Sequence, residues 1–295
     1  MPNSRSRPQR TITQPDRSIC QGPVMPIGGA EEKDGHGEGE SILNRFIALA
    51  GGNNAVIAII PTASEDADEA GQRYVDAFGK LGAKEADWLR VSQREDANGD
   101  DAVRFIERAT GIFITGGDQK TLVELLAGTR VMECIRECNA QGVVVAGTSA
   151  GASILPALMM SGGTGVGGNS NDAAARKGMV EFVAGFGLLQ DIIVDQHFSE
   201  RGRMGRLLTA FAASPGLLGI GLDEDTAVLI DREGTLEVLG SGMVTIVDGR
   251  DTISDYFERA PGEVLTITRS SLHILAPGRQ FDLNIRQAIL PVSSA

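Results

Sequence analysis

Residues 147–155 read GTSAGASIL and place Ser149 in a Gly-x-Ser-x-Gly pattern, directly after the apolar run VVVA. This arrangement is typical of a serine nucleophile on a sharp turn between a strand and a helix. Small residues are also common wherever a helix packs closely on a sheet, so the pattern alone leaves packing and catalysis open. A serine hydroxyl is a poor nucleophile unless a neighbouring base accepts its proton.

Three histidines could supply this base. His36 lies in the polar segment EEKDGHGEGE, and His273 lies in the strand-like segment SLHIL. His197 follows IIVDQ, where a strand ends. Functional groups gather at the carboxyl ends of strands in parallel α/β sheets, so we predict His197 as the general base for Ser149.

The imidazole needs a carboxylate to fix its tautomer, and the transition state needs donors for its oxyanion. The acids between the serine and the histidine are Asp172, Glu181, Asp191 and Asp195. We predict Asp172, in the loop NSNDAAARKG, as the orienting acid. The predicted oxyanion donors are the backbone N–H of Ala150 and one from the Gly117–Asp118 pair, with Asp118 preferred.

The segment SERGRMGRLLTAF, residues 199–211, combines an apolar stripe of helical period with three early arginines. With Ser199 as N-cap, Arg201, Arg203 and Arg206 crowd the first turns, where the helix dipole opposes positive charge. Binding of a carboxylate-rich ligand would explain why arginines occupy this unfavourable position. The alternative explanation is that they form surface salt bridges. On the first reading, replacing Arg203 or Arg206 leaves folding stability nearly unchanged.

The elements that position these residues alternate between apolar strands and helices. Strands are predicted within 55–64, 86–91, 111–118, 142–147, 191–198 and 218–224, and helices within 68–83 and 118–141. This alternation predicts an α/β fold with a mostly parallel sheet and helices on both faces. Period-two stretches in 226–249 predict antiparallel strands toward the C-terminus. We expect a disordered tail over 1–22 and one catalytic domain over 23–295.

Composition narrows the class of protein. The 295 residues carry a formal net charge of −12, which argues against a nucleic-acid partner. No apolar run is long enough to span a bilayer, and the N-terminus lacks the hydrophobic segment of a secretory signal. Cys20, Cys134 and Cys138 form no metal-binding or disulfide pattern. We therefore expect a cytoplasmic protein without a membrane partner, metal or organic cofactor.

Four motifs carry a resemblance to a known family. IGGAEEK, FITGGDQ, GTSAGAS and DQHFSERGRMGRLL occur in this order, and together they closely resemble the cyanophycinases, serine peptidases related to dipeptidase E. The resemblance implies a fold like that of class I glutamine amidotransferases and a homodimer. It also implies a substrate, cyanophycin, which is a poly-aspartate chain with β-linked arginines that is cut to β-Asp-Arg dipeptides.

By the same resemblance, Ser149 and His197 take the nucleophile and base roles. The residues implied to line the substrate pocket are Gln119, Asp195, Gln196, Arg201, Arg203 and Arg206. Acids for the substrate guanidinium groups stay open among Asp195, Asp223 and Glu224.

Other functions remain possible at this point. A dipeptidase that cuts after N-terminal aspartate would share the nucleophile and base. A true α/β-hydrolase usually has a longer interval between serine and histidine than 149 to 197. A catalytically silent binding protein on the same fold would not need the intact Ser149–His197 pair.

Overall fold

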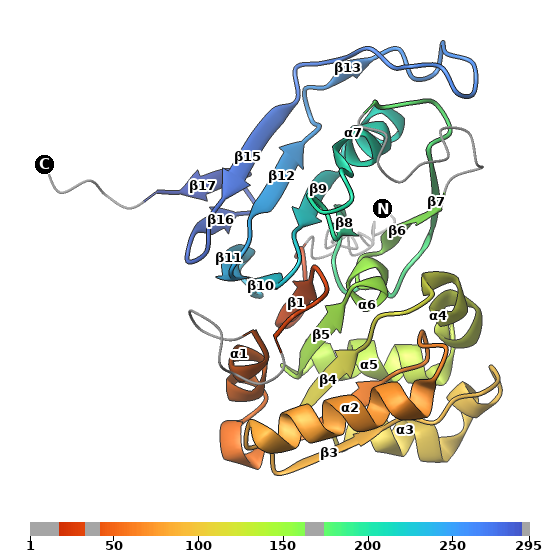
Figure 1. Ribbon diagram of the computed structural model, residues 1–295, viewed down its shortest axis with the longest axis vertical. Helices are drawn as coiled ribbons and strands as arrows, with labels where there is room; N and C mark the ends of the chain where they lie inside the picture. Colours follow the sequence, from red (N-terminus) through yellow and green to blue (C-terminus); the bar gives the residue numbers. More distant parts are fainter. Residues whose placement is uncertain (1–17, 33–41, 163–173, 291–295) are drawn as a thin grey trace, which may run out of the picture.

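The computed structural model describes residues 18–32, 42–162 and 174–290 of the chain (Figure 1). Its largest element is a nine-stranded sheet with the strand order β17-β16-β11-β10-β1-β5-β4-β2-β3. The parallel part comprises β1 (Val24–Ile27), β5 (Val144–Thr148), β4 (Gly111–Ile114), β2 (Val56–Ile60) and β3 (Glu85–Trp88). Antiparallel pairing adds β10 (Thr226–Ile230), β11 (Thr235–Gly240), β16 (Gln280–Asp282) and β17 (Gln287–Ile289).

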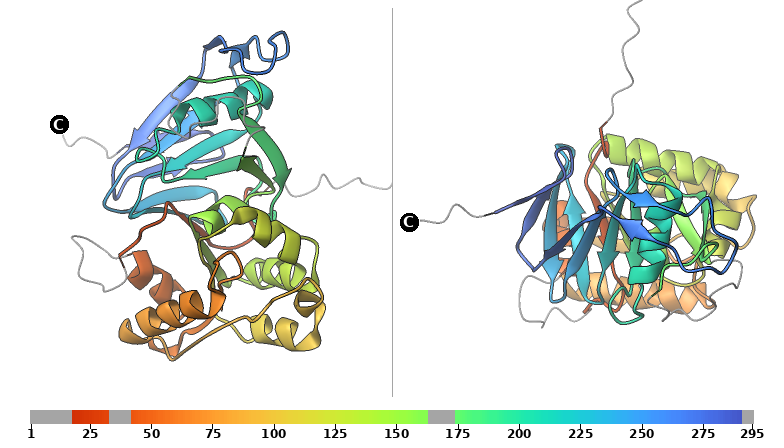
Figure 2. Two further views of the ribbon diagram at one scale, coloured as in Figure 1. Left: turned by 45° about the vertical axis from the view of Figure 1, so that its right-hand side comes forward. Right: turned by 90° about the horizontal axis from the view of Figure 1, so that it is seen from above.

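Helices cover both faces of the parallel strands (Figure 2), so β1, β2, β4 and β5 are almost entirely buried, whereas the edge strand β3 is partly exposed. Successive residues of β5 alternate between two cores: Val144 and Ala146 face one, and Val145 faces the other. The first core contains α1 (Ile42–Leu49) and α2 (Ala67–Lys80). The second contains α3 (Asp100–Glu107), α4 (Gln119–Leu126), α5 (Arg130–Ala140) and the short α6 (Ala150–Ile154).

A second, four-stranded sheet packs beside the antiparallel part of the first, toward the top of Figure 1. It is formed by β15 (Ser271–Leu275), β12 (Val244–Asp248), β9 (Leu218–Leu222) and β8 (Ile192–Gln196). Helix α7 (Met204–Ala213) covers this sheet through Leu207 and Phe211, which pack against Ile193. Because β8 and β9 run parallel, their carboxyl ends lie at the same edge.

Smaller elements complete the described chain. They are the hairpin of β6 (Leu158–Gly162) and β7 (Val180–Ala184), the pair β13 (Ile253–Ser254) and β14 (Ile267–Thr268), and the 3₁₀ turns η1 (Gly52–Asn54) and η2 (Asp96–Asn98).

The predicted α/β class, with parallel strands, helices on both faces and antiparallel C-terminal strands, is confirmed. Three details differ. Strands 191–198 and 218–224 belong to the second sheet, and the helical region 118–141 is two helices separated at Ala127–Thr129. Helix α7 begins at Met204, with Arg203 rather than Ser199 at its N-cap position.

The predicted N-terminal tail lies outside the described residues as far as position 17. From position 18 the chain is packed: Cys20 is buried, and the carbonyl of Ile19 accepts a hydrogen bond from the N–H of Gln190 at 2.8 Å. Residues 18–22, which the sequence places in the tail, thus contact the rest of the described chain. Within the described ranges, no helix is long and apolar enough to cross a membrane.

Candidate active site

Ser149 lies on the turn between β5 and α6, at the carboxyl end of a central parallel strand. Its backbone has a positive φ of 53°, which is strained for a residue with a Cβ. The surrounding glycines make the turn possible, since a Cβ on Gly147 would lie 2.2 Å from the carbonyl oxygen of Gly151. A Cβ on Gly151 would lie 2.3 Å from the carbonyl oxygen of Ile114. Close packing of the backbone and a partly exposed nucleophile are therefore two consequences of the same turn.

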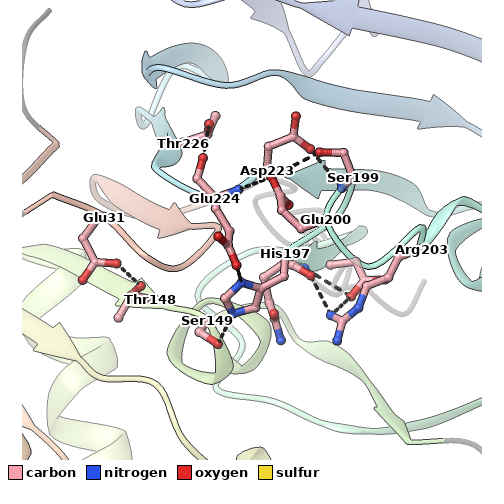
Figure 3. Close-up of polar contacts among 12 residues, drawn as sticks. Glu31, Thr148, Ser149, His197, Ser199, Glu200, Arg203, Asp223, Glu224 and Thr226 are labelled. Atoms are coloured by element: carbon pink, nitrogen blue, oxygen red, sulfur yellow. Dashed lines mark hydrogen bonds and ion pairs between the residues drawn. The ribbon is translucent and has the colours of Figure 1, made fainter. Parts of the chain in front are cut away.

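His197 follows β8 in the second sheet and approaches Ser149 from the opposite side of the site (Figure 3). Its Nε2 lies 3.0 Å from the Oγ of Ser149. Like Ser149, it has a positive φ, 47°. The two predicted residues come from different sheets, and the packing of the sheets brings them together.

The carboxylate beside His197 is Glu224, whose Oε1 lies 2.6 Å from Nδ1 (Figure 3). A carboxylate only accepts hydrogen bonds, so Nδ1 carries the proton and Nε2 presents its lone pair to the serine hydroxyl. Asp172 lies outside the described residues, and its predicted role stays a prediction. Sequence reasoning named Glu224 only as an acid for guanidinium groups. One feature of the sequence could have identified Glu224 as the orienting acid: it directly follows the segment LGIGLD. The strand in this segment, β9, pairs in parallel with β8, so its end lies beside His197.

The loop after β1 connects the three residues through consecutive backbone carbonyls. The carbonyl of Ile27 accepts from the N–H of Ser149 at 3.0 Å, and that of Gly28 accepts from His197 at 2.9 Å. The carbonyl of Gly29 accepts from Asp225, the neighbour of Glu224, at 2.8 Å. The imidazole also rests on Gly29, where a Cβ would lie 2.4 Å from Cε1 of His197.

Of the two predicted oxyanion donors, Ala150 has an available backbone N–H and Asp118 does not. Among the described residues, the N–H of Ala150 at the start of α6 has no hydrogen-bond acceptor. The N–H of Asp118 donates instead to the carbonyl of Ala63 at 2.7 Å. Gly117, at φ 138°, makes the turn that directs Asp118 away, and its own N–H has no acceptor in the described chain. The geometry therefore favours Gly117 over Asp118 as the second donor.

A cavity of about 450 Å³ opens onto Ser149. Its lining includes five of the six predicted substrate residues, Gln119, Gln196, Arg201, Arg203 and Arg206, and also Glu65, Gly117, Asp118, Ser149 and Ala150. The exception is Asp195, whose side chain is fully buried and which does not line the cavity.

Asp195 explains why two of the arginines lie where they do. Arg203 donates to Oδ1 of Asp195 at 2.8 Å and to the carbonyl of Gln196 at 2.6 Å. Arg206 pairs with Oδ2 through Nε at 3.2 Å. Burial lowers the pKa of Arg203, and the charge of Asp195 opposes that shift. Removing one partner of a buried ion pair typically costs about 3–5 kcal/mol, so the expectation that stability is insensitive to Arg203 is not supported.

The acids that the sequence left open for guanidinium groups are already engaged. Asp195 holds the two arginines, and Glu224 holds His197. Asp223 accepts from the N–H groups of Ser199 and Met243, both at 3.1 Å. The carboxylate of Glu65 is exposed and makes no hydrogen bond or ion pair within the described chain, although it lines the cavity with the three arginines.

A serine whose proton can pass to an imidazole held by a carboxylate, at the end of a parallel strand, defines a serine hydrolase site. Among the described residues, no group of three His, Cys, Asp or Glu side chains could hold a metal ion.

Comparison with known proteins narrows this class. Residues 26–238 match the model of peptidase family S51, and the chain belongs to this family. It is 42% identical to a cyanophycinase of Synechococcus elongatus over 269 residues, which cover 90% of this chain and 81% of the relative. It is 41% identical to a cyanophycinase of Geminocystis herdmanii, covering 90% of this chain and 94% of the relative.

Among solved structures, a peptidase from an acI-B1 actinobacterium has a similar fold, with a TM-score of 0.58. The alignment covers 88% of this chain and 98% of that one at 20% identity. The protein is thus a serine peptidase of family S51 with an α/β fold.

The two acids proposed for His197 can be separated by mutation. We expect Glu224→Gln to lower kcat by about 10²-fold or more with little change in KM, because the amide no longer stabilises the imidazolium. Asp172→Asn, at the acid predicted from the sequence, is the comparison: with Glu224 as the orienting acid, it should leave kcat close to the wild-type value. Steady-state kinetics with both purified variants is the measurement. The reverse ranking would assign the orienting role to Asp172.

Proposed function

We propose that this peptidase is an exopeptidase that hydrolyses cyanophycin to β-Asp-Arg dipeptides. The observation that carries the proposal is the cavity beside Ser149, which three arginines and the carboxylate of Glu65 line together. A polymer that presents carboxyl and guanidinium groups in alternation complements such a mixture of charges. The relatives that are 41–42% identical over most of the chain and are named cyanophycinases support the same substrate.

In the proposed mechanism, Ser149 attacks an α-peptide carbonyl of the poly-aspartate backbone while His197 accepts its proton. Glu224 stabilises the imidazolium that forms. The N–H groups of Ala150 and Gly117 donate to the developing oxyanion, and each such donor is typically worth about 3–4 kcal/mol. His197 then protonates the leaving amine, and water attacks the acyl-enzyme to release the dipeptide and restore the hydroxyl.

Substrate recognition in this proposal divides between the two sides of the cavity. Arg201 is exposed and binds substrate carboxylates. Arg203 and Arg206, which pair with Asp195, add positive charge to the same side of the cavity. Glu65 accepts hydrogen bonds from a substrate guanidinium group. The homodimer and the cytoplasmic location stay predictions, and the proposed chemistry needs no metal or organic cofactor.

The direct test incubates the purified protein with cyanophycin and identifies products by mass spectrometry. We expect β-Asp-Arg dipeptides from the wild type and none above background from Ser149→Ala, which lacks only one hydroxyl. An aspartyl dipeptide assay runs in parallel. Cleavage of aspartyl dipeptides with cyanophycin left intact would instead establish the dipeptidase alternative.

The role of Glu65 has its own test. Glu65→Gln keeps the size of the side chain but loses the charge, and we expect kcat/KM for cyanophycin to fall by about 10-fold to 100-fold. This range corresponds to a charged hydrogen bond of about 1.5–3 kcal/mol. Glu107→Gln, an exposed change on α3, is the matched control and should match the wild type. Equal kcat/KM values for the two variants would remove Glu65 from substrate recognition.

A further inference from the structure

Glu31 is a buried carboxylate that the proposed mechanism does not use. It lies in the loop after β1 and is only 3% exposed. Its Oε1 accepts a hydrogen bond from the hydroxyl of Tyr74, and its Oε2 accepts one from Oγ1 of Thr148, both at 2.5 Å. Burying a carboxylate is unfavourable unless hydrogen bonds compensate for the lost water. A position selected for stability alone would more often hold an apolar side chain.

The bond to Thr148 leads directly to the nucleophile. Thr148 is the last residue of β5, is 3% exposed, and immediately precedes the strained Ser149 (Figure 3). Valine would fit a buried strand equally well and would avoid a buried hydroxyl. What the threonine adds is the hydrogen bond that ties the end of β5 to Glu31.

Along the chain, Glu31 is also close to the residue that supports the proposed base, His197. Two residues before it, Gly29 supports the imidazole of His197 and accepts a hydrogen bond from the backbone of Asp225. Gly29 and Ala30 both have positive φ, 104° and 50°, so this loop does not hold its shape through regular secondary structure. Glu31 fixes the far end of the loop against β5.

Tyr74 anchors the opposite side of the carboxylate. It lies on α2, and its ring packs 4.7 Å from that of Phe113 in β4, centroid to centroid. Burial, together with the charge of Glu31, raises the pKa of Tyr74 well above its ordinary value. The hydroxyl therefore stays protonated and continues to donate to Glu31.

We propose that Glu31 and Thr148 are positioning residues, which hold the loop under His197 and the turn of Ser149 at the separation that proton transfer needs. The inference rests on the proposed roles of Ser149 and His197. It predicts a change in kcat rather than in KM, because neither side chain lines the substrate cavity.

Thr148→Val tests the proposal because it removes the hydroxyl and keeps the shape. We expect kcat to fall by about 10-fold to 100-fold with KM unchanged, since small misplacements of reacting groups have effects of this size. Thr148→Ser restores the hydroxyl and should recover most of the activity. Glu31→Gln, a second variant of matched size, should also lower kcat.

Thr129→Val is the matched control. Thr129, the N-cap of α5, is likewise a buried threonine, 1% exposed; its hydroxyl donates to the carbonyl of Leu126 at the end of α4, and it does not line the cavity. Thermal melting should show that both valine variants are destabilised. Steady-state kinetics should show a normal kcat only in Thr129→Val. Equal kcat in the two valine variants, or no recovery in Thr148→Ser, would overturn the inference.

The same comparison separates this inference from the proposed substrate. If the wild type cleaves aspartyl dipeptides and not cyanophycin, the proposed substrate fails, and the kcat ratios measured on dipeptides decide the role of Thr148. A wild type that cleaves neither substrate would overturn both proposals.

Discussion

Three consecutive carbonyl groups at the end of β1 hold the active site together. Ile27, Gly28 and Gly29 accept hydrogen bonds from Ser149, His197 and Asp225, which come from β5, β8 and the end of β9. These strands belong to two different sheets, so nothing in their own pairing sets the distance between serine and histidine. The loop supplies that constraint, and Gly29 leaves room for the imidazole against its backbone.

Charge in the site is organised in two layers. Beneath the cavity, Asp195 is fully buried and pairs with Arg203 and Arg206, which fixes where these cations lie. Facing the cavity, Arg201 and Glu65 are exposed. A fixed lower layer and an accessible upper layer let the site present both signs of charge to a ligand without rearranging its buried ion pairs.

The sequence was most informative where a single local pattern determines the structure. Apolar strands followed by small residues located the turn of Ser149 and the end of the strand before His197. Glu224 was missed because the predicted acid was sought between serine and histidine, whereas the parallel pairing of β8 with β9 brings in a residue after both. Helix rules drew attention to the arginines, but α7 begins only at Met204, so Arg201 and Arg203 lie before it, and the rules do not show that Asp195 is buried beneath Arg203 and Arg206. That contact depends on packing between distant segments, as does the bond that occupies the amide of Asp118.

The central claim is that the loop after β1 sets the geometry of Ser149 and His197, and Gly29→Ala tests it most directly. An added Cβ would lie 2.4 Å from the imidazole, and we expect kcat to fall by about 100-fold or more. Gly142→Ala is the matched control: its φ of 102° is close to the 104° of Gly29, and a Cβ there meets no atom within 4 Å. Both variants carry the backbone strain of a positive φ, and Gly29→Ala alone adds the contact with His197. Wild-type kcat in Gly29→Ala, measured beside Gly142→Ala, would contradict the account.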